Sequence, residues 1–220
     1  MSTALAVIQF NALYLYYSDR PGPVGGSIPK AAISDMEVVS DVELTRVVSK
    51  LIAGNSRAPV NTVLAISDDQ CFALPQRKDK EEDIEKRLVD LIPFSQIASV
   101  KVAAANESYI VATNQDLYES YARALSVVHH PVVLVIPWMT LLQTGISKGE
   151  VDSVTVKRVF DSFPSLRSHA YPLRIENNEA QPPSGEKVAH KPTKLSWGWI
   201  VFGGIALLYA LGMFWFFIRS

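Results

Sequence analysis

The sequence predicts an α/β or α+β domain, a mixed sheet with packed helices, followed by one C-terminal transmembrane helix. Strand-like segments alternate with amphipathic helical segments, a pattern typical of helices packed on a sheet. A polar stretch rich in proline, asparagine and lysine separates these elements from an uncharged apolar run. We therefore expect an α/β domain over 1–142, a linker and flexible tether over 143–195 in which a short helix could form, and a membrane helix over 196–218.

The chain opens with two strand-like segments, 4–10 and 13–17. The tight polar connection at Asn11 and Ala12 predicts that they form a β-hairpin. The segment that follows, 20–29, is rich in proline and glycine, so we expect a loop there.

Helix signals recur along the body of the chain. Ser40 and Glu43 have the spacing of a capping box, and the apolar residues after them recur at helical spacing as far as Gly54. A charged amphipathic segment ends at Pro93, and Asn114 can cap a third helix. The predicted helices begin at residue 41, span 79–91 and 115–125, and could include 152–163.

Further strand-like segments lie between these helices. Segments 62–66 and 71–74 are expected to pair around a turn at Asp68 and Asp69. The other strands are 99–104 with 108–113, and an all-apolar segment, 132–136, of the kind that is buried on both faces of a sheet.

The run from Trp197 to Ile218 contains no charged residue and is long enough to cross the hydrocarbon layer of a bilayer as a helix. Aromatic residues mark its ends, as expected at membrane interfaces: Trp197 and Trp199 at one end, Trp215 with Arg219 at the other. Three lysines precede the run and one arginine follows it, which predicts that the N-terminal body is cytoplasmic, on the inner face of the inner membrane. Small residues on this helix would permit a homo-oligomer.

No motif in the sequence indicates catalysis. The net charge is −1 and the pI about 6.4, so no basic field favours nucleic acid. Neither the single cysteine, Cys71, nor the pair His129 and His130 has metal-ligand spacing around it. No glycine-rich loop has the context of a phosphate cradle. We therefore expect no enzyme activity, no cofactor and no metal.

The order of the elements over residues 4–142 resembles the N-terminal half of PilM, the actin-like inner-membrane platform protein of type IV pilus systems, and its relative GspL of type II secretion. The most particular match is Ile92-Pro93-Phe94 after an acidic helix. The other matching pieces are the opening hairpin, 39–41 before a helix, 62–67, 109–113 and the helix 117–125. The resemblance implies the first lobe of an actin-like fold with an inserted small domain.

The sequence departs from this family at the nucleotide site. The family's opening hairpin carries an Asp-x-Gly turn followed by residues that cradle nucleotide phosphates. Here Gln9 stands where the metal-organising aspartate would be, and Asn11 stands where the turn glycine would be. The second actin-like lobe is replaced by the tether and anchor. The resemblance therefore implies a degenerate, half-size relative without nucleotide chemistry.

The predicted function follows from this resemblance: a membrane-anchored scaffold of a type IV pilus or type II secretion platform that binds partner proteins. In the family, a partner peptide lies in a groove between the first lobe and the inserted domain. The corresponding residues here are Ile92, Pro93, Phe94 and Ile97. Two alternatives stay open, a tail-anchored cytosolic adaptor unrelated to pili and a nucleotide-binding ATPase.

Overall fold

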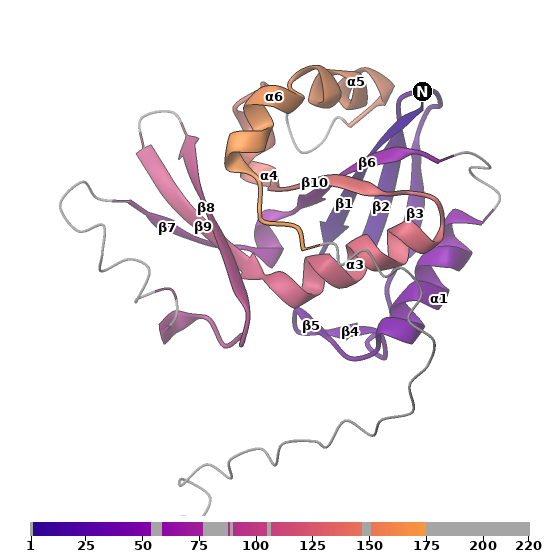
Figure 1. Cartoon of the computed structure of the whole chain (residues 1–220), viewed down its shortest axis with the longest axis horizontal. Coiled ribbons are helices and arrows are strands. Elements are labelled where there is room, and N and C mark those ends of the chain that lie inside the picture. The colour runs from indigo at the N-terminus through magenta and orange to yellow at the C-terminus, as the bar shows by residue number, and fades with distance from the viewer. Residues whose placement is uncertain are drawn as a thin grey trace, which may run out of the picture. The chain divides into compact units, whose positions relative to one another are not determined.

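The computed structural model describes residues 2–53, 59–76, 88, 90–104, 107–146 and 151–174 (Figure 1). The chain divides into two units, 1–176 and 177–220, and every described residue lies in the first. The predicted tether and the predicted span, with Trp197, Trp199, Trp215 and Arg219, fall outside the described residues. Within the described part, no helix has the length and apolar character needed to cross a membrane.

The core of this unit is a five-stranded mixed sheet in the order β10-β6-β1-β2-β3. The first three strands form an antiparallel meander, and β6 and β10 then add parallel to β1. The predicted α/β fold class is therefore confirmed. The strands are β1 (Thr3–Gln9), β2 (Ala12–Tyr17), β3 (Pro23–Ser27), β6 (Asn61–Ile66) and β10 (Val132–Pro137).

Helices cover both faces of this main sheet (Figure 1). Alternate residues of β1 point to opposite faces, so Ala4, Ala6 and Ile8 join one buried cluster while Leu5 and Val7 join the other. One face packs against α1 (Asp41–Ile52) and α3 (Gln115–Val127), and the other against α4 (Trp138–Leu142), α5 (Ser153–Asp161) and α6 (Phe163–Leu166).

A second sheet is inserted between β6 and α3. It consists of β7 (Phe72–Pro75), β8 (Ile97–Ala104) and β9 (Glu107–Asn114), antiparallel in the order β7-β9-β8. It has a small core of its own, with Leu88, Ile92, Ile110 and Ala112 buried. We call this sheet and its core the insertion.

Short elements complete the unit. They are the hairpin of β4 (Ile33–Ser34) and β5 (Glu37–Val38), and the 3-10 turns η1 (Asp68–Gln70) and η2 (Arg167–His169).

Several local predictions are confirmed. The opening hairpin forms, with Phe10 and Asn11 between its strands. The hydroxyl of Ser40 accepts a hydrogen bond from the Glu43 N–H at 3.2 Å and begins α1, as its capping-box spacing predicted. The side chain of Asn114 caps α3, and Asp152 caps α5.

Two predictions about the sheets are wrong, and a third is only partly correct. The supposed loop 20–29 contains β3, which lies at the edge of the main sheet and pairs with β2. The segments around Asp68 and Asp69 do not pair, because η1 turns the chain out of the main sheet and β7 joins the insertion instead. Strand β10 lies at a sheet edge, with Val133 39% exposed, so it is not buried along its whole length.

The packed unit extends past residue 142, where the sequence predicted the body to end. Val156, Val159 and Leu166 of α5 and α6 are buried against Leu5 and Val63 of the main sheet. These helices supply the apolar cover for the second face of the sheet, which would otherwise be exposed to water.

Candidate functional site

A groove lies at the junction between the insertion and the rest of the unit, which consists of the main sheet and its covering helices and which we call the main lobe. Its volume is about 440 Å³. Three parts of the chain contribute to it: the β5 hairpin with the start of α1, the segment before β8, and the β9–α3 junction. It is lined by Glu37, Val38, Val39, Asp41, Phe94, Ser95, Asn114, Asp116, Ser120 and Arg123.

The side chain of Asn114 joins two parts of this groove, α3 and the β4–β5 hairpin. Strand β9 ends at this residue and α3 begins at the next, so no loop separates them. The Asn114 Oδ1 atom accepts a hydrogen bond from the Asp116 N–H at 3.0 Å, which caps the helix. Its Nδ2 atom donates to the Met36 carbonyl at 2.9 Å, which fixes the β4–β5 hairpin, where Met36 has a φ of 65°. The side chain is therefore both a helix cap and a clamp.

The polar wall of the groove is a face of α3. Asp116, Ser120 and Arg123 are spaced four and then three residues apart, so they project from one side of the helix. Arg123 Nη2 lies 2.7 Å from Ser120 Oγ and 3.3 Å from Asp41 Oδ1. Within the described residues, Glu37 and Asp116 form no ion pair. The lining therefore carries an excess of negative charge.

Apolar side chains face the groove from both the main lobe and the insertion. Val39 is 59% exposed, so its side chain is accessible from the groove. Phe94 is half-buried, and its ring meets the Phe72 ring of β7 edge-to-face with 6.1 Å between centroids. The groove thus combines apolar contact area with an acidic rim.

The four residues predicted to contact a partner occupy different environments. Phe94 lines the groove, and Pro93 beside it is exposed. Ile92 is 4% exposed, in the core of the insertion, and Ile97 packs partly against that core. Neither Val39 nor the α3 residues were predicted as contacts. The polar face of α3 resembles ordinary solvated surface in the sequence, and only the fold brings another element opposite it.

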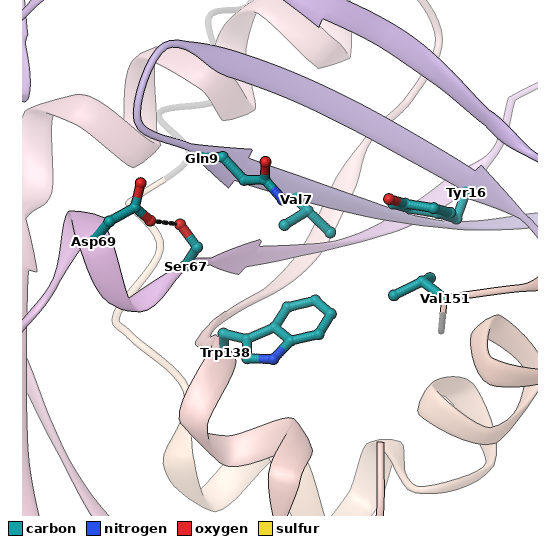
Figure 2. Close-up of a pocket in the computed structure, with 7 residues that line it drawn as sticks. All are labelled: Val7, Gln9, Tyr16, Ser67, Asp69, Trp138 and Val151. Atoms are coloured by element: carbon teal, nitrogen blue, oxygen red, sulfur yellow. Dashed lines mark hydrogen bonds between the residues drawn. The ribbon is translucent and has the colours of Figure 1, made fainter. Parts of the chain in front are cut away.

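A second, smaller hollow lies where β1, β6 and β10 end (Figure 2). Its volume is about 220 Å³. The Asp69 carboxylate accepts a hydrogen bond from the Phe10 N–H at 2.8 Å and one from the Ser67 hydroxyl. The lining residues are Val7, Gln9, Tyr16, Ser67, Asp69, Trp138 and Val151.

The charge of this hollow opposes phosphate binding. The backbone N–H of Phe10, in the hairpin turn, already donates to a carboxylate and is not free for a phosphate oxygen. Asp69 is the one charged residue in the described lining, and its negative charge would repel an anion. Gln9, an uncharged residue, also lines this hollow.

A buried histidine lies on the other side of the main sheet from this hollow. His130 is fully buried, and its Nδ1 atom lies 2.8 Å from the Val128 carbonyl, which can only accept, so Nδ1 carries the proton. Its Nε2 atom then accepts from the Tyr17 hydroxyl at 3.0 Å. The Arg20 guanidinium lies 4.0 Å from the centroid of the Tyr17 ring.

Burial lowers the pKa of His130 below 6.5, and the nearby charges of Arg20 and His129 lower it further, against a raising effect of the Val128 hydrogen bond. In the unfolded chain the His130 imidazole binds a proton near pH 6.5, whereas in the folded chain it does so only at a lower pH. The free energy of unfolding should therefore fall as the pH drops from about 6.5 through the lowered pKa, and this contribution should be complete above pH 6.5.

Urea unfolding of the full chain at a series of pH values from 5 to 8 measures this effect. His130→Gln removes the titrating group and should flatten the profile in that window. His129→Asn is the matched control, because His129 is exposed at a φ of 64° that asparagine tolerates. It should keep the wild-type slope except for the small part that comes from the effect of His129 on the pKa of His130. An unchanged slope in His130→Gln would contradict the assignment.

Comparison with known proteins finds similarity in solved structures only. The sequence matches no protein-family model and no curated protein. A chain of the PilM–PilN type IV pilus biogenesis complex is similar with a TM-score of 0.39 and 16% identity, over 60% of this chain and 46% of that one. The cytoplasmic domain of EpsL, an inner-membrane component of the type II secretion system of Vibrio cholerae, is similar with a TM-score of 0.35 and 10% identity. That match covers 62% of this chain and 57% of the EpsL chain, so this chain spans about half the length of each structure.

Proposed function

We propose that this chain is a scaffold that docks a segment of a partner protein in the groove between its main lobe and its insertion. The observation that carries the proposal is the groove itself, which contains Phe94 of the Ile92-Pro93-Phe94 corner that the sequence resemblance singled out. On this proposal the chain acts within an inner-membrane platform for type IV pili or type II secretion. It works by binding and not by turning over a nucleotide.

The chemistry of the groove suits a peptide segment. A volume of about 440 Å³ accommodates a few side chains, and most of the residues that line the groove are polar or charged. Val38 and Val39 of the main lobe and Phe94 of the insertion supply the apolar contacts. The unpaired carboxylates of Glu37 and Asp116, among the described residues, would select a segment that carries a positive charge.

Membrane attachment through residues 196–218, with the body on the cytoplasmic side, is part of the proposal. It rests on the uncharged sequence of that segment and on the lysines that precede it. Attachment would confine the groove near other membrane proteins and raise the effective concentration of the partner. A weak interface would then be sufficient for assembly.

The absence of nucleotide chemistry is likewise proposed. Its support is the hydrogen bond from the Phe10 N–H to Asp69, together with the acidic character of the small hollow. A protein that bound ATP at this position would need that N–H and a cation directed at the phosphates.

The proposal is tested by affinity purification of the full-length protein from mildly crosslinked native membranes, with partners identified by mass spectrometry. Val39→Glu places a charge and extra bulk in the groove at an exposed position, so the fold should be kept. Val154→Glu is the matched control, because Val154 is 57% exposed and lies on α5, which contributes no residue to the groove.

We expect wild type and Val154→Glu to recover pilus or secretion platform proteins and Val39→Glu to lose at least nine-tenths of that recovery. Equal recovery by both variants would exclude the groove as the docking site. Recovery of no platform protein by the wild type would exclude the pilus and secretion role and favour an unrelated adaptor.

A further inference from the structure

The segment Arg167–Arg174, which we call the strap, crosses the base of the insertion. The insertion is joined to the main lobe by two chain segments, 67–71 and 113–115. These lie side by side, because the Thr113 hydroxyl donates to the Gln70 carbonyl at 2.8 Å. Any change in the inclination of the insertion must bend both segments at this point. In Figure 1 the strap runs in orange from α6 past the insertion toward α3.

Tyr171 of the strap is placed at this double connection. Its side chain is 3% exposed. The hydroxyl lies 3.7 Å from Cys71 Sγ, at the end of the first connecting segment, and donates at 3.4 Å to the Val111 carbonyl, just before the second. Its backbone N–H donates to the Val135 carbonyl of β10 at 2.8 Å. One residue therefore contacts the first connection and strand β9 just before the second, and is itself fixed to the main sheet.

The neighbours of Tyr171 extend the same attachment. His169 Nδ1 lies 2.8 Å from the Lys101 carbonyl of β8 and donates to it. The ring of Tyr171 stacks on Tyr118 of α3, with 5.6 Å between centroids and 19° between planes. The Tyr118 hydroxyl donates to the Pro172 carbonyl at 2.6 Å. The strap thus binds the insertion, α3 and the main sheet at once.

Helix α3 lies between the strap and the groove. Tyr118, which faces the strap, is two residues from Asp116 and two from Ser120, which face the groove, so these side chains leave the helix on roughly opposite sides. A change in how α3 packs against Tyr171 would therefore move the polar wall of the groove. A change in the inclination of the insertion would move the wall that carries Phe94.

We propose that Tyr171 is a positioning residue that sets the angle between the insertion and the main lobe and, through it, the width of the groove. Release of the strap would let the insertion swing and the groove change shape. The strap is also the last described segment before the second unit, which begins at residue 177.

This proposal concerns the shape of the unit and does not depend on the identity of the partner, so it can fail or stand independently of the proposed function. The simpler alternative is that the strap only contributes to stability. The experiment must therefore compare variants that lose similar stability at different places. Tyr171→Leu keeps apolar bulk but loses the ring stacking and the hydroxyl contacts, and Val159→Ala removes buried methyl groups from α5 on the far face of the sheet.

The inclination of the insertion is measured as a distance distribution between spin labels on full-length protein. Cysteines at the exposed positions Lys50 of α1 and Ser108 of β9 carry the labels, in a Cys71→Ser background that serves as the reference. Tyr171→Leu should shift or at least double the width of the distribution, and Val159→Ala should leave it unchanged. An unchanged distribution in Tyr171→Leu, or an equal change in both variants, would overturn the proposal.

Amide hydrogen exchange on the same variants without labels gives a second reading. Tyr171→Leu should accelerate exchange at least tenfold in peptides that cover 67–71 and 113–116, relative to Val159→Ala. Acceleration confined to the strap itself would show that Tyr171 does not position the insertion.

Discussion

Gly25→Ala is expected to separate β3 from the main sheet and to lower the free energy of unfolding by about 3 kcal/mol, the upper part of the range for overpacking that displaces backbone. Gly25 lies opposite Tyr14 in the β2–β3 pair. A Cβ on Gly25 would lie 2.0 Å from the Leu13 carbonyl oxygen and 2.8 Å from the Tyr14 Cα. Both contacts are with backbone, so no side-chain rotation can relieve them.

Gly26→Ala is the matched control for this prediction. A Cβ there would meet Leu51 Cδ2 at 3.1 Å, and that atom is the end of a flexible side chain that can move aside. Urea unfolding followed by circular dichroism, with hydrogen exchange on the β2 peptides, gives the two free energies and shows where protection is lost. Equal stability of the two variants would mean that the close approach of β2 and β3 does not exclude a side chain at residue 25.

Asn114→Ala is expected to lower the free energy of unfolding by about 2 kcal/mol, because a lost helix cap and a lost buried hydrogen bond each cost about 1 kcal/mol. Both bonds come from one side chain that is 5% exposed: the cap to the Asp116 N–H and the bond to the Met36 carbonyl. The measurement is chemical unfolding of the full chain.

Asn114→Ser separates the two contributions. Serine is a good helix cap, but its short side chain cannot reach the Met36 carbonyl, so about half of the loss should remain. The backbone amides at the start of α3 should stay protected from hydrogen exchange in Asn114→Ser and should exchange faster in Asn114→Ala. If Asn114→Ser and Asn114→Ala lower the free energy of unfolding equally, the cap does not contribute. If neither variant lowers it, the two hydrogen bonds do not stabilise the fold.

Features that depend on short stretches of sequence could be predicted. The caps at Ser40 and Asn114 work within one turn of helix, so their residue types and spacing are sufficient to place α1 and α3. The pairing of β8 with β9 likewise follows from adjacent strand-like segments and a short connection.

Features that depend on distant partners could not be predicted. Segment 23–27 becomes a strand only because β2 offers an edge to which a glycine can fit closely. Strands β6 and β7 belong to different sheets, although they are neighbours in sequence. The packing of α5 and α6 on the main sheet also depends on distant partners, because nothing in the sequence near residue 142 indicates which face of the sheet still lacks helices.

The candidate groove shows the same division. The resemblance led to Phe94, because the Ile92-Pro93-Phe94 corner is a local pattern. The opposite walls come from β5, α1 and α3, which are far from this corner in sequence. Sequence reasoning could therefore name one wall of the groove but not the chemistry that faces it.

The hydrogen bond between Thr113 and Gln70 also bears on how this protein can change in evolution. It holds together the two ends of an excursion that leaves the main sheet after β6 and returns at α3. Doubling the length of a flexible excursion adds only about 0.6 kcal/mol to its closure. The insertion can therefore lengthen, shorten or exchange its sequence while the main sheet keeps its strand order. We therefore expect related proteins to differ in the length of the insertion more than in the strand order of the main sheet.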